Sequence, residues 1–323
     1  MSLRRPFFIG PFLMLFFQAT GWAAVSAPVL QWGSTMVGTR GGSVYYLNDS
    51  VVGGNVLGAR IAYGLYEQRA DGTVVHSLAT SPTAAAKSAV RVGDYVYFTG
   101  NEGGVYRTRV ANTPTPWSSF AAVTISNGLA LETMATDGKW IFGSTTAEND
   151  QIHAYSVDAA TGALTLQWST TGIAGRGCGL CWDESGYLYT VDGGGTSEST
   201  VGNTANMYAI AANSGATTDM GQITFNGRLY QTLREGNQII VFDSFRGTDA
   251  PAGQMYVYDL ASDTSLVQAT PSAVYDPAEI DCIYGAAIDG NHLWLTSGGG
   301  KTYGYLISKP SASKTTGRSA SAP

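Results

Sequence analysis

The stretch PVLQWGST (28–35), near the start of the chain, is nearly repeated in the middle as LTLQWST (164–170). Both stretches contain Leu-Gln-Trp, and both are typical of a short β-strand. A terminal segment that matches an internal one is expected where a chain of repeats closes on itself. The match therefore predicts a repeat protein in which residues 28–35 and 164–170 hold the same place in different repeats.

Six segments of the chain share one layout, which is a short strand, a Gly/Asp turn and then an aromatic-rich strand. Their turn glycines follow one another at intervals of about 45 to 54 residues, within the range of propeller repeats. Glycine suits these turns because a tight hairpin needs positive φ angles. The six segments are residues 34–49, 88–101, 132–145, 179–193, 230–244 and 284–298, with turn glycines Gly42, Gly93, Gly138, Gly186, Gly236 and Gly290.

A third predicted strand follows every pair, and a fourth follows in all repeats except the last. Four antiparallel strands make one blade of a β-propeller. The predicted third strands are residues 59–68, 104–111, 151–158, 206–212, 254–260 and 301–308, and the fourth are 74–80, 118–125, 164–170, 219–225 and 265–271.

Residues 28–35 supply the strand that the sixth repeat lacks, because they precede the first blade and match a fourth strand. Pairing them with residues 301–308 leaves no blade with an unpaired inner edge. We therefore predict an all-β fold, a single six-bladed β-propeller over residues 25–308 that is closed by the N-terminal strand acting as outer strand of the last blade. Two stacked β-sandwiches, or a seventh blade hidden in residues 43–87, are the alternatives.

Residues 1–24 have the features of a secretory signal peptide, with basic Arg4 and Arg5, an apolar run from Phe7 and a small-residue end. Such a leader predicts a secreted or periplasmic protein. An uncleaved membrane anchor is the alternative, because the apolar run approaches the length that spans a bilayer. The paired arginines also resemble a twin-arginine export signal. Residues 309–323 are rich in Ser, Lys and Pro and are predicted to form a disordered tail.

The 323-residue chain carries 18 basic and 24 acidic residues, and its leader and tail contain basic residues but no acidic one. The predicted propeller is thus more acidic than the formal net charge of −6 indicates. An acidic body disfavours nucleic acid as a partner, and no stable membrane insertion is expected once the leader is cleaved. We predict a monomer whose partner is a protein, a small molecule or a carbohydrate.

The hairpin YSVDAATGALTLQW (155–168) resembles the Asp-x-x-Thr-Gly…Trp hairpin of quinoprotein-like and YVTN-type propellers. In those families the Asp and the Thr-Gly pair make the turn between the third and fourth strands. The resemblance implies this role for Asp158, Thr161 and Gly162, although the spacing to Trp168 is longer than in the quinoprotein motif. It also implies the propeller fold, and it is not specific to one activity.

Oxygen-bearing side chains recur in the loops between second and third strands and in the connections between blades. A propeller gathers these segments at one mouth of its channel, and clustered carboxylates and amides suit Ca²⁺, which takes about six to eight oxygen ligands. The six-bladed calcium-dependent lactonases and phosphotriesterases resemble this arrangement, since they hold an ion with Glu, Asn and Asp at that mouth. Ordinary turn chemistry is the alternative. The candidate metal ligands are Asn127, Glu132, Asp192, Asp243 and Asp281.

The same loop face carries the candidates for ligand binding. Phe245 is one of them, and its ring, like that of Trp117, could stack on a sugar or another planar ligand. No catalytic residue is assigned. The histidines His76, His153 and His292 fall on separate parts of the repeat map, which disfavours a Ser-His-Asp triad. The candidate ligand-binding residues are Arg176, Arg228, Asp243, Phe245, Arg246 and Asp281.

Three cysteines follow the predicted leader. Cys178 and Cys181 lie close together in RGCGLCW (176–182), and export makes a disulfide between them the default. Cys282 holds the same repeat position as Cys178 two blades away, beyond the roughly 7 Å between Cα atoms that a disulfide spans. We therefore predict a Cys178–Cys181 disulfide and an unpaired Cys282, with a redox or thiolate-metal role as the alternative.

Together these features predict an exported β-propeller that binds a ligand or a protein through its loop face, because a well-formed scaffold lacks a recognisable catalytic constellation. One alternative is a calcium-assisted hydrolase or lactonase, in which the ion at the channel mouth polarises a carbonyl group or activates water. A second alternative is a quinoprotein-like dehydrogenase. Calcium is the one cofactor that the residues suggest.

Overall fold

The computed structural model describes β-strands, turns and short connections. For the strands up to residue 78, and at some later positions, it describes the backbone alone. Among the described residues, no helix is long and apolar enough to cross a membrane. The predicted leader and tail lie outside the described residues, which are 28–33, 44–46, 55–60, 64–69, 74–78, 88–99, 104–109, 120–145, 151–171, 173, 177–192, 202–227, 229–243, 253–276, 280, 283–289, 292–297 and 301–306.

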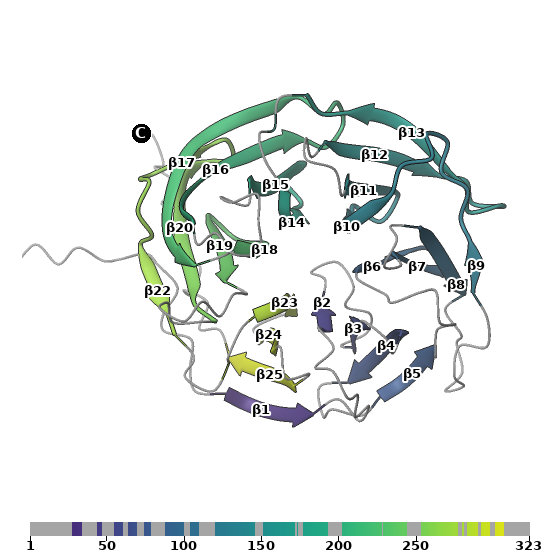
Figure 1. The fold of residues 1–323 in the computed structure, drawn as a ribbon, viewed down its shortest axis with the longest axis horizontal. Helices are drawn as coiled ribbons and strands as arrows, with labels where there is room; N and C mark the ends of the chain where they lie inside the picture. Colours follow the sequence, from purple (N-terminus) through teal and green to yellow (C-terminus); the bar gives the residue numbers. More distant parts are fainter. Residues whose placement is uncertain are drawn as a thin grey trace, which may run out of the picture.

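The described strands form six antiparallel sheets that stand around a common centre (Figure 1). In five of the sheets the strands follow one another in chain order, and the first strand lies nearest the centre (Figure 1). This arrangement confirms the predicted all-β propeller, and the alternative of two stacked sandwiches is wrong. The first three of these sheets consist of β2 (Val44–Tyr46), β3 (Asn55–Arg60), β4 (Gly64–Arg69) and β5 (Val74–Leu78); of β6 (Ser88–Val92), β7 (Tyr95–Thr99), β8 (Val105–Arg109) and β9 (Ala121–Ala122); and of β10 (Leu131–Thr136), β11 (Trp140–Thr145), β12 (Ile152–Val157) and β13 (Leu164–Ser169).

The next two sheets have the same order, and the sixth combines the two ends of the described chain. These sheets consist of β14 (Gly177–Trp182), β15 (Tyr187–Asp192), β16 (Gly202–Ala211) and β17 (Thr217–Gly227); of β18 (Leu229–Glu235), β19 (Gln238–Asp243), β20 (Met255–Ser262), β21 (Ser265–Leu266) and β22 (Ala273–Tyr275); and of β23 (Ile283–Asp289), β24 (His292–Ser297), β25 (Lys301–Leu306) and β1 (Pro28–Gly33).

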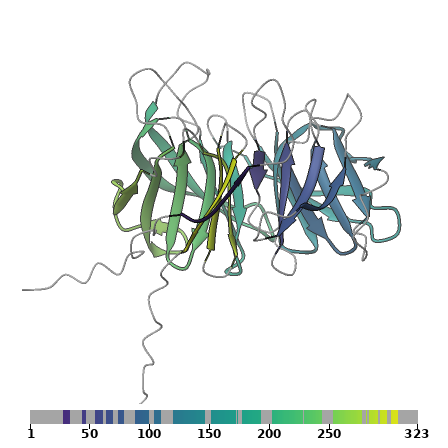
Figure 2. The same ribbon diagram turned by 90° about the horizontal axis from the view of Figure 1, so that it is seen from below.

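Strand β1 lies antiparallel to β25, with Gln31 opposite Tyr303 and Trp32 opposite Thr302. The order of this sheet is β1-β25-β24-β23, so the start of the described chain occupies the outer edge of its last sheet (Figures 1 and 2). A strand there gives hydrogen-bond partners to the edge of β25, which would otherwise be exposed.

The first sheet differs from the prediction. Residues 44–46, expected as a second strand after a turn at Gly42, form the first strand β2 and pair with β3. The single third strand expected at residues 59–68 is two strands, because β3 and β4 pair antiparallel with each other. The aromatic pattern does not indicate β3, because Asn55–Arg60 contains no aromatic residue. All four strands between residues 44 and 78 belong to one sheet.

The outer strand of the fifth sheet also differs from the single strand expected at residues 265–271. The strand is split, because β21 pairs with one end of β20 and β22 pairs with the other end. Pro271 lies between the two pieces and has no backbone N–H to donate to a ladder. The chain resumes the pairing immediately afterwards, where the Ser272 backbone N–H donates to the Val257 carbonyl at 2.7 Å.

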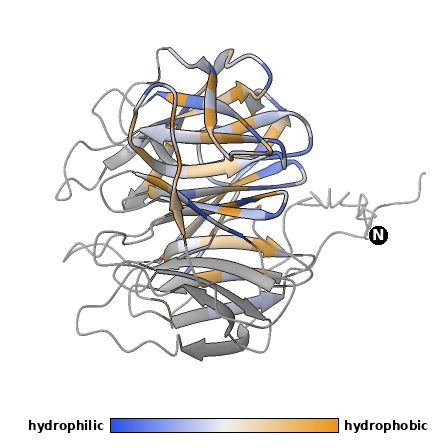
Figure 3. Cartoon of the chain, turned by 90° about the vertical axis from the view of Figure 1, so that its right-hand side faces the viewer, coloured by the Kyte–Doolittle hydropathy of each residue, from blue (hydrophilic) through white to orange (hydrophobic). Residues whose placement is uncertain are grey.

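The apolar core lies between the sheets. Four clusters of buried side chains each draw residues from two neighbouring sheets, and the fully buried aromatics Tyr97, Tyr155, Tyr189 and Tyr258 belong to two of these clusters. Figure 3 shows hydrophobic residues along the described strands and many hydrophilic ones at the turns. Alternation of side chains along each strand explains this pattern, since both faces of a blade meet a neighbour.

The close packing between blades is testable at Gly179 in β14. Its φ is +58°, and an added Cβ would lie 2.6 Å from the Gln231 Cα of the next blade. Gly93 has the same φ of +58° and open space around it. We expect Gly93→Ala to lose about 1 kcal/mol of unfolding free energy from backbone strain alone. Gly179→Ala should lose at least about 2 kcal/mol more, because two backbones must separate.

Urea unfolding of the two variants and of the unmodified protein measures this difference. Equal losses for Gly179→Ala and Gly93→Ala would contradict the close approach of β14 to β18.

Candidate functional site

Most of the predicted ligand-binding residues lie outside the described residues, so the loop-face site stays a prediction. For two of the candidates the backbone alone is described, since Asp243 ends β19 and Glu132 lies in β10. The candidates outside the described residues are Arg176, Arg228, Phe245, Arg246 and Asp281, together with Trp117 and Cys282.

Two candidate metal ligands have described side chains, and they lie in different places. Asp192 is buried at the end of β15, where its carboxylate accepts hydrogen bonds from the Asn206 backbone N–H at 2.5 Å and side-chain Nδ2 at 2.9 Å. Burial raises the pKa of Asp192 above its usual value, against the effect of these hydrogen bonds. Asn127 instead contacts the Tyr155 hydroxyl, beside the β12–β13 hairpin.

Asn127 thus lies in the connection before the third sheet, whereas Asp192 ends a strand of the fourth sheet. Among the residues with described side chains, no group of three or more His, Cys, Asp and Glu could hold a metal ion.

The two close cysteines lie in one strand, β14, whose register with β15 shifts between them. Cys181 is buried in the core between two blades. The side chain of Cys178 lies outside the described ones, so the Cys178–Cys181 disulfide stays a prediction.

The three histidines lie in three different sheets, His76 in β5, His153 in β12 and His292 in β24. His153 is buried, and its Nδ1 shares a hydrogen bond of 2.7 Å with the Ser169 hydroxyl. Its Nε2 is buried without a hydrogen-bond partner. Burial lowers the pKa of His153, so the neutral ring is favoured and the side chain belongs to the packing of its blade.

The hairpin that carries the family resemblance has the expected turn. The Asp158 carboxylate accepts hydrogen bonds from the backbone N–H of Ala160 at 3.0 Å and of Thr161 at 2.6 Å. Gly162 follows with φ +67°, and β13 begins two residues later. The roles that the resemblance implied for Asp158, Thr161 and Gly162 are confirmed.

A cleft of about 400 Å³ lies on the opposite side of the ring from the predicted loop face. This side, which we call the hairpin-turn face, carries the turns between first and second strands at residues 93–94, 137–139, 183–186 and 236–237. The cleft lies between the third and fourth sheets and contains aromatic and polar side chains. These are Asp137, Trp140, Trp182, Ser185, Tyr187 and Asn213, beside small residues at 186, 211 and 212.

The aromatic side chains of the cleft are half-buried. Trp140 and Trp182 pack partly on the core between their two blades, and Tyr187 packs partly on the next core along the ring. Trp140 and Tyr187 are both the first residue of a second strand, in neighbouring sheets. Each ring therefore has one part fixed by packing and another part at the cleft.

The first wall of the cleft is held by Asp137. Its Oδ1 accepts hydrogen bonds from the backbone N–H of Lys139 at 2.8 Å and of Trp140 at 2.7 Å. Such a turn, in which the side chain satisfies the next backbone donors, fixes the approach to β11. These hydrogen bonds fix the Asp137 carboxylate next to Trp140, and both side chains line the cleft.

The second wall is the turn after β16, which is held by Trp168 from the neighbouring sheet. The Trp168 Nε1–H donates to the Ala212 carbonyl at 3.0 Å. The same indole packs so closely on Gly215, φ +73°, that an added Cβ would lie 2.6 Å from it. The Ala212 backbone N–H also donates to the Gly186 carbonyl at 3.0 Å. These contacts fix Asn213, which is exposed at the cleft.

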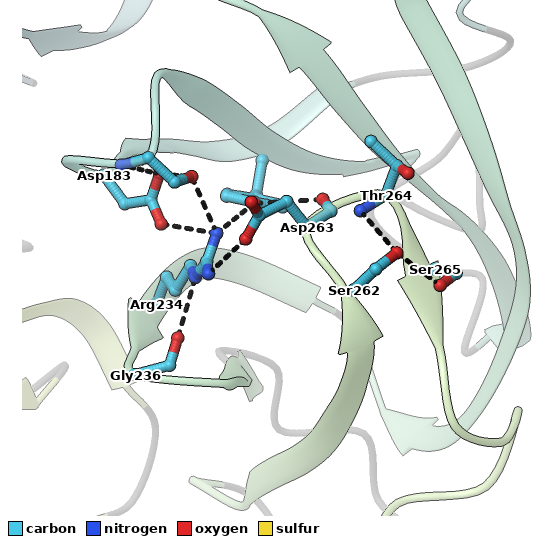
Figure 4. Close-up of polar contacts among 9 residues, drawn as sticks. Asp183, Arg234, Gly236, Ser262, Asp263, Thr264 and Ser265 are labelled. Carbon is cyan, nitrogen blue, oxygen red and sulfur yellow. Dashed lines mark hydrogen bonds and ion pairs between the residues drawn. The ribbon is translucent and has the colours of Figure 1, made fainter. Parts of the chain in front are cut away.

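The third wall is the turn at residues 183–186, which is held from behind by Arg234 of the fifth sheet (Figure 4). The Arg234 Nη1 lies 2.5 Å from the Asp183 carboxylate and donates to the Ser185 hydroxyl at 3.1 Å. The Ser185 hydroxyl donates in turn to Asp183 at 2.5 Å. Ser185 therefore belongs both to this network and to the cleft.

The guanidinium group of Arg234 joins three turns of two blades. Its Nη2 donates to Asp263 at 2.6 Å and its Nε–H to the Gly236 carbonyl at 2.9 Å (Figure 4). It also contacts the Tyr189 hydroxyl, which donates to the Asp263 carbonyl at 3.0 Å. Arg234 and Asp183 are only 11% and 16% exposed, whereas Asp263 is 44% exposed.

The electrostatics of this network hold its members in fixed charge states. Burial raises the pKa of Tyr189 far above its usual value, and the nearby Asp183 raises it further. Burial alone would lower the pKa of Arg234, but the hydrogen bond to Asp263 and the charge of Asp183 raise it. The neutral form of Tyr189 and the charged form of Arg234 are therefore both favoured.

Sequence reasoning missed this cleft. Alternation along the aromatic-rich second strands predicts the same place, the core between blades, for Tyr97, Trp140, Tyr189 and Trp294. Three of them are fully buried there, but Trp140 is only partly buried and reaches the cleft. The available signal was a pair of aromatic residues at the same position of neighbouring repeats, Trp140 and Tyr187, next to a longer turn.

Comparisons with known proteins support the fold. No protein-family model matches the chain, and no curated protein matches it. A chain in a crystal structure of the mitotic checkpoint complex is similar, with 14% identity, a TM-score of 0.56, and 95% of this chain and 97% of that chain covered. Virginiamycin B lyase from Staphylococcus aureus is similar with 15% identity, a TM-score of 0.52, and 81% and 79% of the two chains covered. At this identity the likeness shows a β-propeller scaffold and no activity.

The Arg234 network should contribute strongly to stability. Arg234→Ala leaves the nearly buried Asp183 carboxylate without its cation, and we expect a loss of about 3 kcal/mol of unfolding free energy. Arg234→Lys should lose less, because the charge remains although the planar fork is lost. Asp263→Asn, at a more exposed carboxylate, should cost about 1 kcal/mol or less.

Urea unfolding at neutral pH measures the three losses. A loss for Arg234→Ala that does not exceed that for Asp263→Asn would contradict the role of Arg234 as the centre of the network.

Proposed function

We propose that this protein is an exported β-propeller that acts as a binding module, and that the cleft on the hairpin-turn face is a ligand site. The observation that carries the proposal is the preorganisation of the cleft. Its three walls come from different turns, and Asp137, Trp168 and Arg234 each hold one of them. A site whose side chains are already fixed loses little conformational entropy when a ligand binds.

The size and lining of the cleft also support the proposal. Ligand sites are concave, partly apolar, and have a few polar groups that orient the ligand. The cleft offers about 400 Å³ with aromatic rings and three polar side chains, Asp137, Ser185 and Asn213. Half-exposed tryptophans on a fixed surface are costly to leave in water, and a ligand that covers them recovers that free energy.

Export is the part of the proposal that rests on the leader at residues 1–24. A protein partner on the loop face remains part of the same proposal, through Arg176, Arg228, Phe245 and the other candidates named there. The similar chain of the mitotic checkpoint complex is part of a protein assembly, which agrees with a propeller used as a scaffold. The calcium-assisted hydrolase and the quinoprotein-like dehydrogenase stay alternatives that rest on the loop face.

We further infer that the six sheets are the six blades of one closed ring and that β1 is its clasp. Deletion of residues 25–33 should then destabilise the whole protein by several kcal/mol, because each lost backbone hydrogen bond costs about 1 kcal/mol. The deletion also leaves β25, which contains Tyr303 and Tyr305, without a strand at its outer edge. Deletion of the predicted tail, residues 309–323, is the matched control and should leave stability unchanged. Thermal unfolding measures both.

If the deleted protein does not fold alone, a synthetic peptide of residues 25–35 added in trans should restore the folded state. Equal stability of the two deletion variants would contradict a clasp.

The binding proposal can be tested with ligand-observed saturation-transfer NMR. The full chain is screened against a library of neutral saccharides, organic amines, carboxylates and short peptides. At least one compound should give a signal that is lost in the Trp140→Ala/Trp182→Ala double variant. Asn237→Ala, an exposed asparagine in the β18–β19 turn, should retain the signal. If no compound of any class distinguishes the double variant from the unmodified chain, the cleft is not a ligand site.

A further inference from the structure

The lining of the cleft distinguishes between classes of ligand. Among the described residues that line it, Asp137 is the only carboxylate, and none is an arginine, a lysine or a histidine. A phosphate, sulfate or carboxylate ligand would meet this carboxylate with no arginine or lysine in the lining to compensate for the repulsion. Anionic ligands are therefore disfavoured, and a neutral or cationic one remains.

A cation fits part of the cleft. Aromatic rings and one carboxylate attract quaternary ammonium groups, which aromatic cages bind in other proteins. Such a group has no hydrogen-bond donor or acceptor, however. It would leave the Asn213 amide without a partner in the complex, which costs free energy when this group loses contact with water.

A sugar ring satisfies both kinds of side chain. One face of a pyranose ring consists of C–H groups, which can cover the exposed parts of Trp140, Trp182 and Tyr187. Its rim of hydroxyl groups both donates and accepts hydrogen bonds. Asp137 supplies an acceptor. The Ser185 oxygen supplies another, since its proton is donated to Asp183, and the Asn213 amide both donates and accepts. A volume of about 400 Å³ has room for a sugar of one or two rings.

The position of the polar groups agrees with this chemistry. Asp137 uses its Oδ1 for the backbone N–H of Lys139 and Trp140, and a carboxylate has a second oxygen for a ligand. Ser185 is already oriented by Asp183 and Arg234. The hydrogen-bonding groups thus come from three separate turns around the aromatic rings, as a ring with hydroxyls on several sides requires.

We propose that the cleft between Trp140, Trp182 and Tyr187 binds a neutral saccharide, stacked on the aromatic rings and held at its rim by Asp137, Ser185 and Asn213. This proposal rests on the function proposed above and names the class of its ligand. It assigns the site to the hairpin-turn face, and not to the loop face that the sequence favoured.

The test is isothermal titration calorimetry of the full chain against a defined set of neutral probes: β-1,4-linked glucose and N-acetylglucosamine trisaccharides, α-1,4-linked glucose trisaccharide and a mannose disaccharide. Tetramethylammonium and a polar tripeptide are the comparison probes. We expect at least one saccharide to bind, and Trp182→Ala to weaken that binding about tenfold or more.

Trp182 packs partly on the core, so its replacement could also affect folding. Asn213→Ala is the second variant, because this side chain is exposed and its loss removes only rim hydrogen bonds. It should weaken saccharide binding several-fold at unchanged melting temperature. Asn237→Ala, in a turn away from the cleft, is the matched control and should bind like the unmodified chain.

Each outcome decides between the proposals. Saccharide binding that depends on Trp182 and Asn213 supports both the function and the ligand class. Binding of tetramethylammonium or the tripeptide alone, with the same dependence, overturns the saccharide and leaves the binding module standing. Saccharide binding that is unaffected by either variant overturns this site. No binding by any probe overturns the saccharide proposal, and the wider library screen then decides on the binding module.

Discussion

The structure depends on the burial of apolar side chains between neighbouring sheets. Every described core cluster draws its side chains from two adjacent sheets, so neither sheet has a core of its own. Apolar burial is the main stabilising term in folding, and a single blade alone would expose both apolar faces. The stable unit is therefore larger than one blade. The same constraint explains why the N-terminal strand β1 lies beside β25, in the last sheet, and not beside the strands that follow it in the chain.

Apolar packing has little directional preference, and polar contacts fix how neighbouring blades meet at the hairpin-turn face. Arg234 is nearly buried, which is costly for a guanidinium group unless its donors are satisfied. Its planar fork reaches Asp183, Asp263 and the Gly236 carbonyl at the same time, which a lysine could not do. The network joins three turns of the fourth and fifth sheets. The position of the 183–186 turn, and with it one wall of the cleft, thus depends on a residue from the next blade.

The cleft arises beside two turns, 137–139 and 183–186, that are longer than the matching turns of the second and fifth sheets. The turn between β14 and β15 spans four residues, 183–186, whereas the matching turns at residues 93–94 and 236–237 span two. This longer turn brings Ser185 and Tyr187 opposite Trp140 of the neighbouring sheet. A propeller of uniform repeats would have the same surface around its whole hairpin-turn face. Variation in turn length, on a scaffold that is fixed by its core, is a direct way to form a single site.

The sequence alone determined the fold class, most strand positions and the Asp158–Gly162 turn, because these follow from local chemistry: alternating side chains, glycines with positive φ, and side chains that satisfy nearby backbone groups. The sequence pattern misplaced the strands of the first sheet, because Asn55–Arg60 contains no aromatic residue to mark it as a strand. Only the tertiary structure decided that Trp140 lines a cleft while Tyr189 is buried. Alternation tells which face of a strand a residue occupies. Whether the neighbouring blade covers that residue depends on how turns distant in the sequence meet, and no local pattern records that.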